Sequence, residues 1–207
     1  PPTSRLKIVD EYIRDLFKDE LIRGLKYHDA RHTLHPTKGV VASANRIALS
    51  EKISDHDREL LLTAAYFHDA GYIREYAPNE PIAARMAGRI LKLIGFNPDE
   101  IEMIQKMILA TDLAVKPQTH VEKILCDADL DHFGREDFFE LDGKLREGRR
   151  VRGIDVSDDE KWYKGTLAVM TNHQYYTESQ IKMRDKEKQK NIERLLEKLE
   201  VIQQRRS

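Results

Sequence analysis

The strongest constraint on the fold is an apolar segment, Leu60–Gly71, with the sequence LLLTAAYFHDAG. Residues at the spacing of a single helix face include three apolar side chains and one histidine: Leu61, Ala64, Ala65 and His68. The spacing therefore predicts a buried helix that carries His68 on its inner face. Gly71 is typical of a helix C-terminus, so we expect Asp69 in the last turn, near the negative end of the helix dipole.

The adjacent His68 and Asp69 have two interpretations. A carboxylate at a buried helix C-terminus is unfavourable unless a cation compensates its charge, and a metal ion held by both side chains would do so. The plainer alternative is a satisfied core histidine beside a solvated aspartate. The dipeptide alone favours this alternative, because the pair often occurs by chance. Residues elsewhere in the chain decide between the two.

The other long apolar segments also have a period of 3.6 residues, and no segment shows a convincing strand pattern. We therefore expect an all-α fold. Glycine, proline and asparagine mark the helix ends; Asn79, for example, is expected to cap a helix that Gly95 ends. With 207 residues, of which 40% are hydrophobic, the chain is long enough to bury a core as one domain, with or without a helical appendage.

Composition excludes several classes of partner. The chain has 35 Lys and Arg against 36 Asp and Glu, a formal net charge of -1, so no overall field attracts nucleic acid or an anionic membrane. No apolar run approaches the roughly 18 residues needed to cross a bilayer. Cys126 is the single cysteine, which excludes an internal disulfide and fits a reducing compartment. We therefore expect a cytoplasmic protein that binds neither membrane nor nucleic acid; its oligomeric state is not predicted.

Further metal-competent side chains lie in two other segments. The stretch Tyr27–Pro36 has no helical period and contains three histidines, His28, His32 and His35. Histidines on a loop seldom cluster for packing reasons, although we interpret His35 as structural. The second segment, Cys126–Gly134, places three aspartates in an otherwise core-like helix. With the central helix, the order along the chain is His, His-Asp, Asp.

Helix geometry separates the aspartates of the second segment. Asp129 is four residues after Leu125 and four before Phe133, which places it on an inward, apolar face. Asp127 shares its face with Lys123 and Asp131, and that face is expected to be solvated. A carboxylate on the inward face needs a cation, and the metal suggested for the central helix is the evident partner. Asp129 is therefore preferred as the fourth ligand, with Asp127 as the alternative.

The chain resembles the HD-domain superfamily of metal-dependent phosphohydrolases from about residue 27 to residue 138. The resemblance rests on three motifs of this sequence: Tyr27-His28 with His32-Thr33, His68-Asp69-Ala70-Gly71-Tyr72, and Cys126–Gly134. It implies an HD-domain-like helical bundle with a C-terminal helical extension. We expect one HD-type domain over residues 1–207, with the motif-bearing core at about 25–140 and the extension at about 157–207.

The resemblance also implies a metal site. His32, His68, Asp69 and Asp129 are expected to hold one divalent ion, and this mixed nitrogen and oxygen set favours Mn, Fe, Co or Ni, with Mg or Zn as alternatives. Binuclear relatives use further histidines after the His-Asp pair, and this chain has no histidine in the two corresponding places, Asn79-Glu80 and Thr111-Asp112. The expected chemistry is phosphoester hydrolysis by a metal-activated water. Asp69 is assigned a catalytic role as well.

The residues that act on the substrate are less defined. His28 matches a histidine that protonates the leaving oxygen in related cyclic-nucleotide phosphodiesterases, but Asp29 replaces the asparagine that usually follows, so a loop-stabilising role is an equal alternative. Arg74 and Lys116 are candidate phosphate contacts in loops, with solvated surface charges as the alternative. The expected substrate is a nucleotide or another small phosphorylated metabolite. A non-catalytic, nucleotide-binding regulatory HD module is the second hypothesis, and a purely structural helical protein is the third.

Overall fold

The computed structural model describes residues 2–22, 28–73 and 78–206. These residues form α-helices and short 3-10 helices without any strand, so the all-α expectation is confirmed. The chain divides into two compact units, Pro1–Asp129 and Leu130–Ser207, which we describe separately. Whether both belong to the single domain expected from the sequence stays a prediction.

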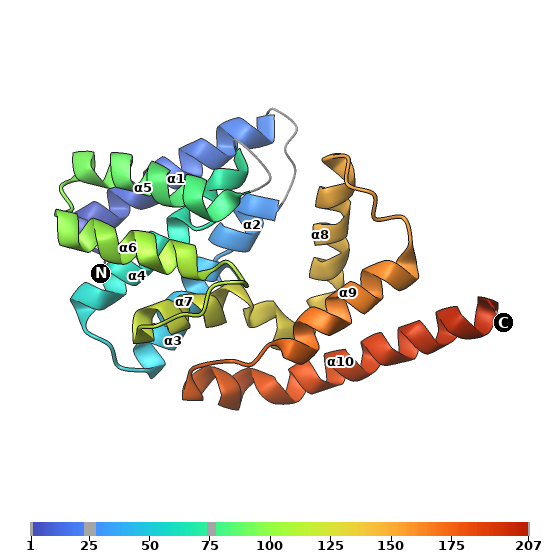
Figure 1. Ribbon diagram of the computed structural model, residues 1–207. Coiled ribbons are helices and arrows are strands. Elements are labelled where there is room, and N and C mark those ends of the chain that lie inside the picture. The colour runs from blue at the N-terminus through green and yellow to red at the C-terminus, as the bar shows by residue number, and fades with distance from the viewer. Residues whose placement is uncertain (1, 23–27, 74–77, 207) are drawn as a thin grey trace. The chain divides into compact units, whose positions relative to one another are not determined.

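The first unit holds all of the metal-competent motifs up to Asp129. Its helices, within the described residues, are α1 (Ser4–Ile22), α2 (His28–Leu34), α3 (Val40–Ser50), α4 (Asp55–Phe67), η1 (Ala70–Ile73), α5 (Asn79–Ile94), α6 (Pro98–Ala110) and α7 (His120–Asp129). Helices α5 and α6 lie side by side (Figure 1). α4 packs against α1, α3, α6 and α7, which makes it the central helix of the unit.

The central position of α4 follows from its composition. Every residue from Glu59 to Gly71 is buried, so the helix has no solvated face in its second half. Ser54 caps its start by accepting a hydrogen bond from the backbone N–H of Asp57. The predicted burial of His68 is confirmed, since its side chain is 0% exposed.

Gly71 and Asn79 differ from the sequence prediction. α4 ends at Phe67 with His68 as its C-cap, and the chain continues into η1, so Gly71 is not the left-handed residue that ends the helix. Gly71 is required for a close approach instead: a Cβ there would lie 2.3 Å from the backbone oxygen of Asn79. Asn79 is the first residue of α5 and Pro78 holds the N-cap position. The other end of α5 is as predicted, because Gly95 has a positive φ of 100°.

The second unit has a small core of its own. Its helices are η2 (Asp131–Gly134), α8 (Phe138–Val151), α9 (Asp159–Asn172) and α10 (Glu178–Arg206), and α9 lies along α10 (Figure 1). The core consists of five buried side chains: Phe133, Phe138, Met170, Tyr175 and Leu195.

Asp131 also differs from the prediction, since it was expected on a solvated helix face. It is 3% exposed and its carboxylate accepts hydrogen bonds from Gln180 at 2.6 Å and from Arg184 at 2.7 Å. These bonds join η2 to α10. Across the described part of both units, no helix has the length and apolar character needed to span a membrane.

Candidate metal centre

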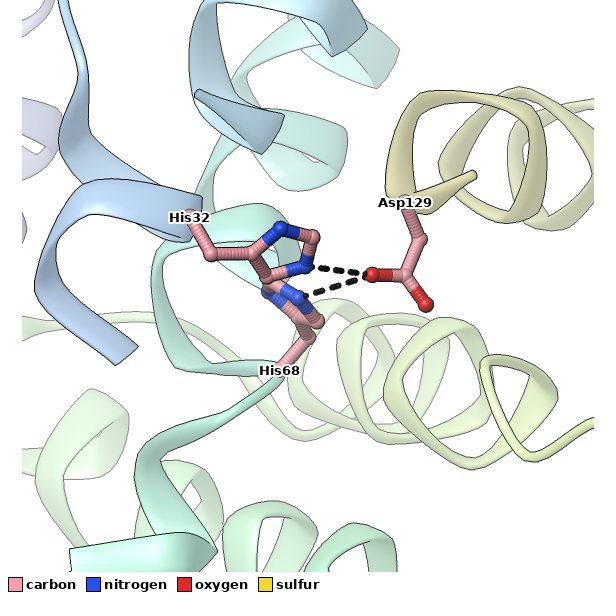
Figure 2. A group of neighbouring side chains, drawn as sticks. All are labelled: His32, His68 and Asp129. Atoms are coloured by element: carbon pink, nitrogen blue, oxygen red, sulfur yellow. Dashed lines mark hydrogen bonds and ion pairs between the residues drawn. The ribbon is translucent and has the colours of Figure 1, made fainter. Parts of the chain in front are cut away.

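Three side chains from separate helices converge in the first unit. His32 lies in α2, His68 is the C-cap of α4, and Asp129 is the last residue of α7. One ligand atom of each lies within 4.8 Å of the others. Figure 2 shows both imidazoles directed at the same carboxylate oxygen of Asp129.

The distances in this group are those of direct polar contacts. Oδ1 of Asp129 lies 2.8 Å from Nε2 of His32 and 3.2 Å from Nε2 of His68. Asp69 faces the same two imidazoles: its Oδ2 lies 3.4 Å from Nε2 of His68 and 3.7 Å from Nε2 of His32. Asp69 supplies none of the three ligand atoms that lie closest together, which belong to His32, His68 and Asp129, although its carboxylate lies next to them.

The hydrogen bonds of His68 define its tautomer. Nδ1 donates a hydrogen bond to the backbone oxygen of Ala65 at 2.6 Å. A neutral ring with its proton on Nδ1 presents the lone pair of Nε2 to the site. Nε2 is buried and makes no hydrogen bond of good geometry, in spite of the nearby carboxylates. Such a nitrogen is available to a cation.

The electrostatics of the group also require a cation. Burial alone would lower the pKa of His68, but the carboxylates of Asp69 and Asp129 outweigh it and raise that pKa well above its ordinary value. Burial alone would raise the pKa of Asp69 and of Asp129, yet the two imidazoles hold both below their usual range. The imidazoles and carboxylates therefore stabilise one another only when a proton or a metal ion lies among them.

The helix ends strengthen this requirement. His68 and Asp129 both lie at C-termini, where unpaired backbone carbonyl groups give the helix its negative end. The buried Nε2 of His68, which lies 3.2 Å from Oδ1 of Asp129, fits a divalent cation together with two carboxylates and two helix C-termini. Mixed nitrogen and oxygen donors of this type suit a first-row transition metal.

The burial of the group is asymmetric. The side chains of His68 and Asp69 are 0% and 9% exposed, whereas those of His32 and Asp129 are 23% and 18% exposed. The group is therefore closed on the side of α4 and open to solvent on the side of α2 and α7. A structural metal site is normally closed on all sides, and a catalytic one keeps an open position.

A further carboxylate near the site was not assigned from the sequence. Glu80, the second residue of α5, is half-buried, and burial raises its pKa. The negative charges of three other carboxylates act in the same direction: Asp112, Asp69 and Asp129. Its position directly after Asn79, in the helix that follows the His-Asp pair, is the only sequence signal that could have drawn attention to it.

The structure separates the two aspartates that competed as the fourth ligand. Asp129 lies beside both histidines, and its role as a metal ligand stays a prediction. The reason given for rejecting Asp127 is wrong, however, because Asp127 is not on a solvated face: its side chain is 0% exposed. Helix α7 packs against α3, α4 and α6, so it has buried faces on more than one side.

The remaining candidates are placed as follows. His35 accepts hydrogen bonds from the backbone N–H groups of Thr37 and Lys38, which confirms a structural role in a turn. His28 begins α2, one turn before His32, but its side chain lies outside the described residues. Arg74 lies outside the described residues altogether. Lys116 is exposed in the segment between α6 and α7, and its phosphate contact stays a prediction.

Comparison with protein families gives one match. Residues 33–134 match the family model of the HD domain. The matched segment begins directly after His32 and contains His68, Asp69 and Asp129. Neither curated proteins nor solved structures yielded a match.

Proposed function

Because the chain belongs to the HD-domain superfamily of metal-dependent phosphohydrolases, we propose that it hydrolyses a phosphoester of a nucleotide or another small phosphorylated metabolite. The observation that carries the proposal is the convergence of His32, His68 and Asp129 within 4.8 Å on a solvent-open side of the first unit. A shared fold does not define chemistry by itself, so the argument depends on these side chains.

In the proposed centre, one divalent ion is held by His32, His68, Asp69 and Asp129. Two neutral imidazoles and two carboxylates balance its charge. Mn, Fe, Co and Ni are favoured by the donor set, with Mg and Zn as alternatives. When bound, such an ion supplies Lewis acidity: it polarises a phosphoryl oxygen and lowers the pKa of a water.

The protein's own groups provide orientation and exclusion of solvent. The hydrogen bond from His68 Nδ1 to Ala65 holds the ring in one tautomer and one direction. Burial of His68 and Asp69 keeps water from the inner side of the centre. The substrate approaches from the outer side, where His32 and Asp129 are partly exposed.

Proton transfer to the leaving oxygen is assigned to His28. Its ordinary pKa is near neutrality, which suits a general acid. It precedes His32 by four residues in α2, so the two backbone positions share one face of the helix. Arg74 and Lys116 are assigned to the substrate phosphate, and no nucleic-acid or membrane partner is proposed.

A phosphate-release screen across nucleotides and small phosphoesters tests the proposal. We expect activity that is abolished by a chelator and restored by a transition metal. His68→Gln and Asp69→Asn should remain folded and lose activity. His120→Gln is the matched control, because His120 is about half exposed and lies at the first residue of α7, away from the ligand cluster.

Two results would contradict the proposal. Full turnover after complete chelation would exclude the metal-dependent reaction. Metal and nucleotide binding without any phosphate release across the screen would favour the regulatory module instead.

A further inference from the structure

Asn79 makes an unusual set of hydrogen bonds for the first residue of a helix. The residue is 2% exposed. Its amide nitrogen donates to the backbone oxygen of His68 at 2.9 Å and to Oδ1 of Asp69 at 3.3 Å. Its amide oxygen accepts from the backbone N–H of Tyr72 at 3.1 Å. All three bonds reach the segment His68–Tyr72, which follows α4 and carries the His-Asp pair.

These bonds make the two oxygens of Asp69 unequal. Oδ1 is in contact with the Asn79 amide, whereas Oδ2 faces the Nε2 atoms of both histidines. An amide N–H that donates to Oδ1 competes with a cation for that oxygen. Oδ2 is therefore the oxygen that remains directed at the metal centre.

Asn79 is in close contact with the segment His68–Tyr72. Gly71 lies so close to Asn79 that an added Cβ would be 2.7 Å from the amide oxygen, in addition to its clash with the backbone. The side chain of Asn79 is thus fixed on one side by Gly71 and on the other by Asp69. A neutral amide fits here because it donates to two oxygens and accepts from one N–H at the same time.

We propose that Asn79 is a positioning residue for the metal centre, which holds Asp69 so that Oδ2 alone is presented to one divalent ion. This inference rests on the proposed function, because it assumes that Asp69 is a ligand. Asn79 itself does not touch the ion. It controls the geometry of a ligand, Asp69. Groups that orient metal ligands in this way commonly change metal affinity when they are removed.

The test is the dissociation constant of Mn²⁺, measured by calorimetry on metal-free protein that comprises residues 1–207. Asn79→Ala removes all three hydrogen bonds, and Asn79→Ser is a second, smaller polar replacement that keeps the test possible if the alanine variant does not fold. We expect both to weaken Mn²⁺ binding about 10- to 100-fold. Turnover is not needed for this measurement.

Gln105→Ala is the matched control. Gln105 lies in α6 and donates a hydrogen bond at 3.0 Å to the backbone oxygen of Ala84 in α5, so its removal also loosens the contacts of α5. Among the described residues, its side chain donates no hydrogen bond to a proposed ligand. We expect Gln105→Ala to lower the melting temperature and leave the dissociation constant of Mn²⁺ unchanged.

The possible outcomes separate this inference from the proposed function. Equal Mn²⁺ affinity in the wild type and both Asn79 variants would overturn the positioning role and leave the metal centre intact. An equal loss in the Gln105 variant would overturn it as well, because general loosening of α5 would then explain the effect. Failure of the wild type to bind any divalent ion would remove the proposed function and this inference together.

Discussion

The substitution Asp129→Asn is the sharpest test of the proposed metal centre, because it removes one charge and changes the shape of the side chain very little. Asp129 Oδ1 is the atom that both imidazoles approach, at 2.8 and 3.2 Å. An amide at this position retains an oxygen but loses the negative charge. The expected effect is a loss of metal affinity without loss of the fold.

The magnitude follows from the distances. Since the three ligand atoms lie within 4.8 Å of one another, an ion equidistant from them lies at most about 3 Å from each. Removing a unit charge at about 3 Å from a divalent ion costs about 3 kcal/mol even at the dielectric constant of water, which corresponds to about 100-fold in the dissociation constant. Partial burial of the site reduces screening, so this value is a lower limit.

The assay is titration of metal-free protein with Mn²⁺, and Asp127→Asn is the control. Asp127 carries the same substitution on the same helix and is more deeply buried than Asp129. We expect the control to lower stability and to keep the Mn²⁺ affinity, whereas Asp129→Asn loses the affinity. The reverse pattern would refute the assignment and move the ligand to the other side of α7.

Three further predictions concern the framework of the first unit. Arg5 binds Glu59 and Glu100 at 2.8 Å each, so Arg5→Ala should lower the free energy of unfolding in urea by about 2–3 kcal/mol; no loss would show that the pairs contribute nothing. Hydrogen bonds from Arg5 lower the pKa of Glu100 to about 2, below its unfolded value, so the stability from this group is present above about pH 4 and disappears as pH falls towards about 2. The difference in the free energy of unfolding between wild type and Arg5→Ala should therefore shrink when urea denaturation is repeated at lower pH. A constant difference would show that the bonds from Arg5 to Glu100 are not the source of the pH dependence. Gly71→Ala should destabilise by about 1–3 kcal/mol in the same assay because its Cβ meets the Asn79 backbone; a neutral effect would mean that α5 shifts freely.

The fold could be predicted because its signals are local. The 3.6-residue period of the Leu60–Gly71 segment is set by neighbours in sequence, and the structure buries that segment completely. Gly95 was predicted as a helix end for a similar reason, since its left-handed backbone follows from the last turn of the same helix. Signals of this type do not depend on which distant segment packs nearby.

The site could be predicted only in part, because the rest depends on distant contacts. A glycine can be needed either for a positive φ or for a close approach of another segment to the backbone, and the sequence around Gly71 does not distinguish these two needs. Asp131 was placed on a solvated face, since its partners Gln180 and Arg184 lie about fifty residues later. Asp127 was misplaced because one helical face was assumed to be free, whereas α7 is packed by several helices.

The plainer interpretation of His68 and Asp69 fails on two counts. A satisfied core histidine uses both ring nitrogens, but Nε2 of His68 is buried without a good hydrogen bond, and only Nδ1 is paired. A solvated aspartate was also expected, yet Asp69 is 7% exposed and shares its surroundings with the carboxylate of Asp129. A buried carboxylate, a partly exposed carboxylate and a buried lone pair are stabilised together by a cation among them. A proton meets that need at one nitrogen, whereas a divalent ion would meet it for both imidazoles and both carboxylates at once, which is the physical ground for proposing a metal at this group.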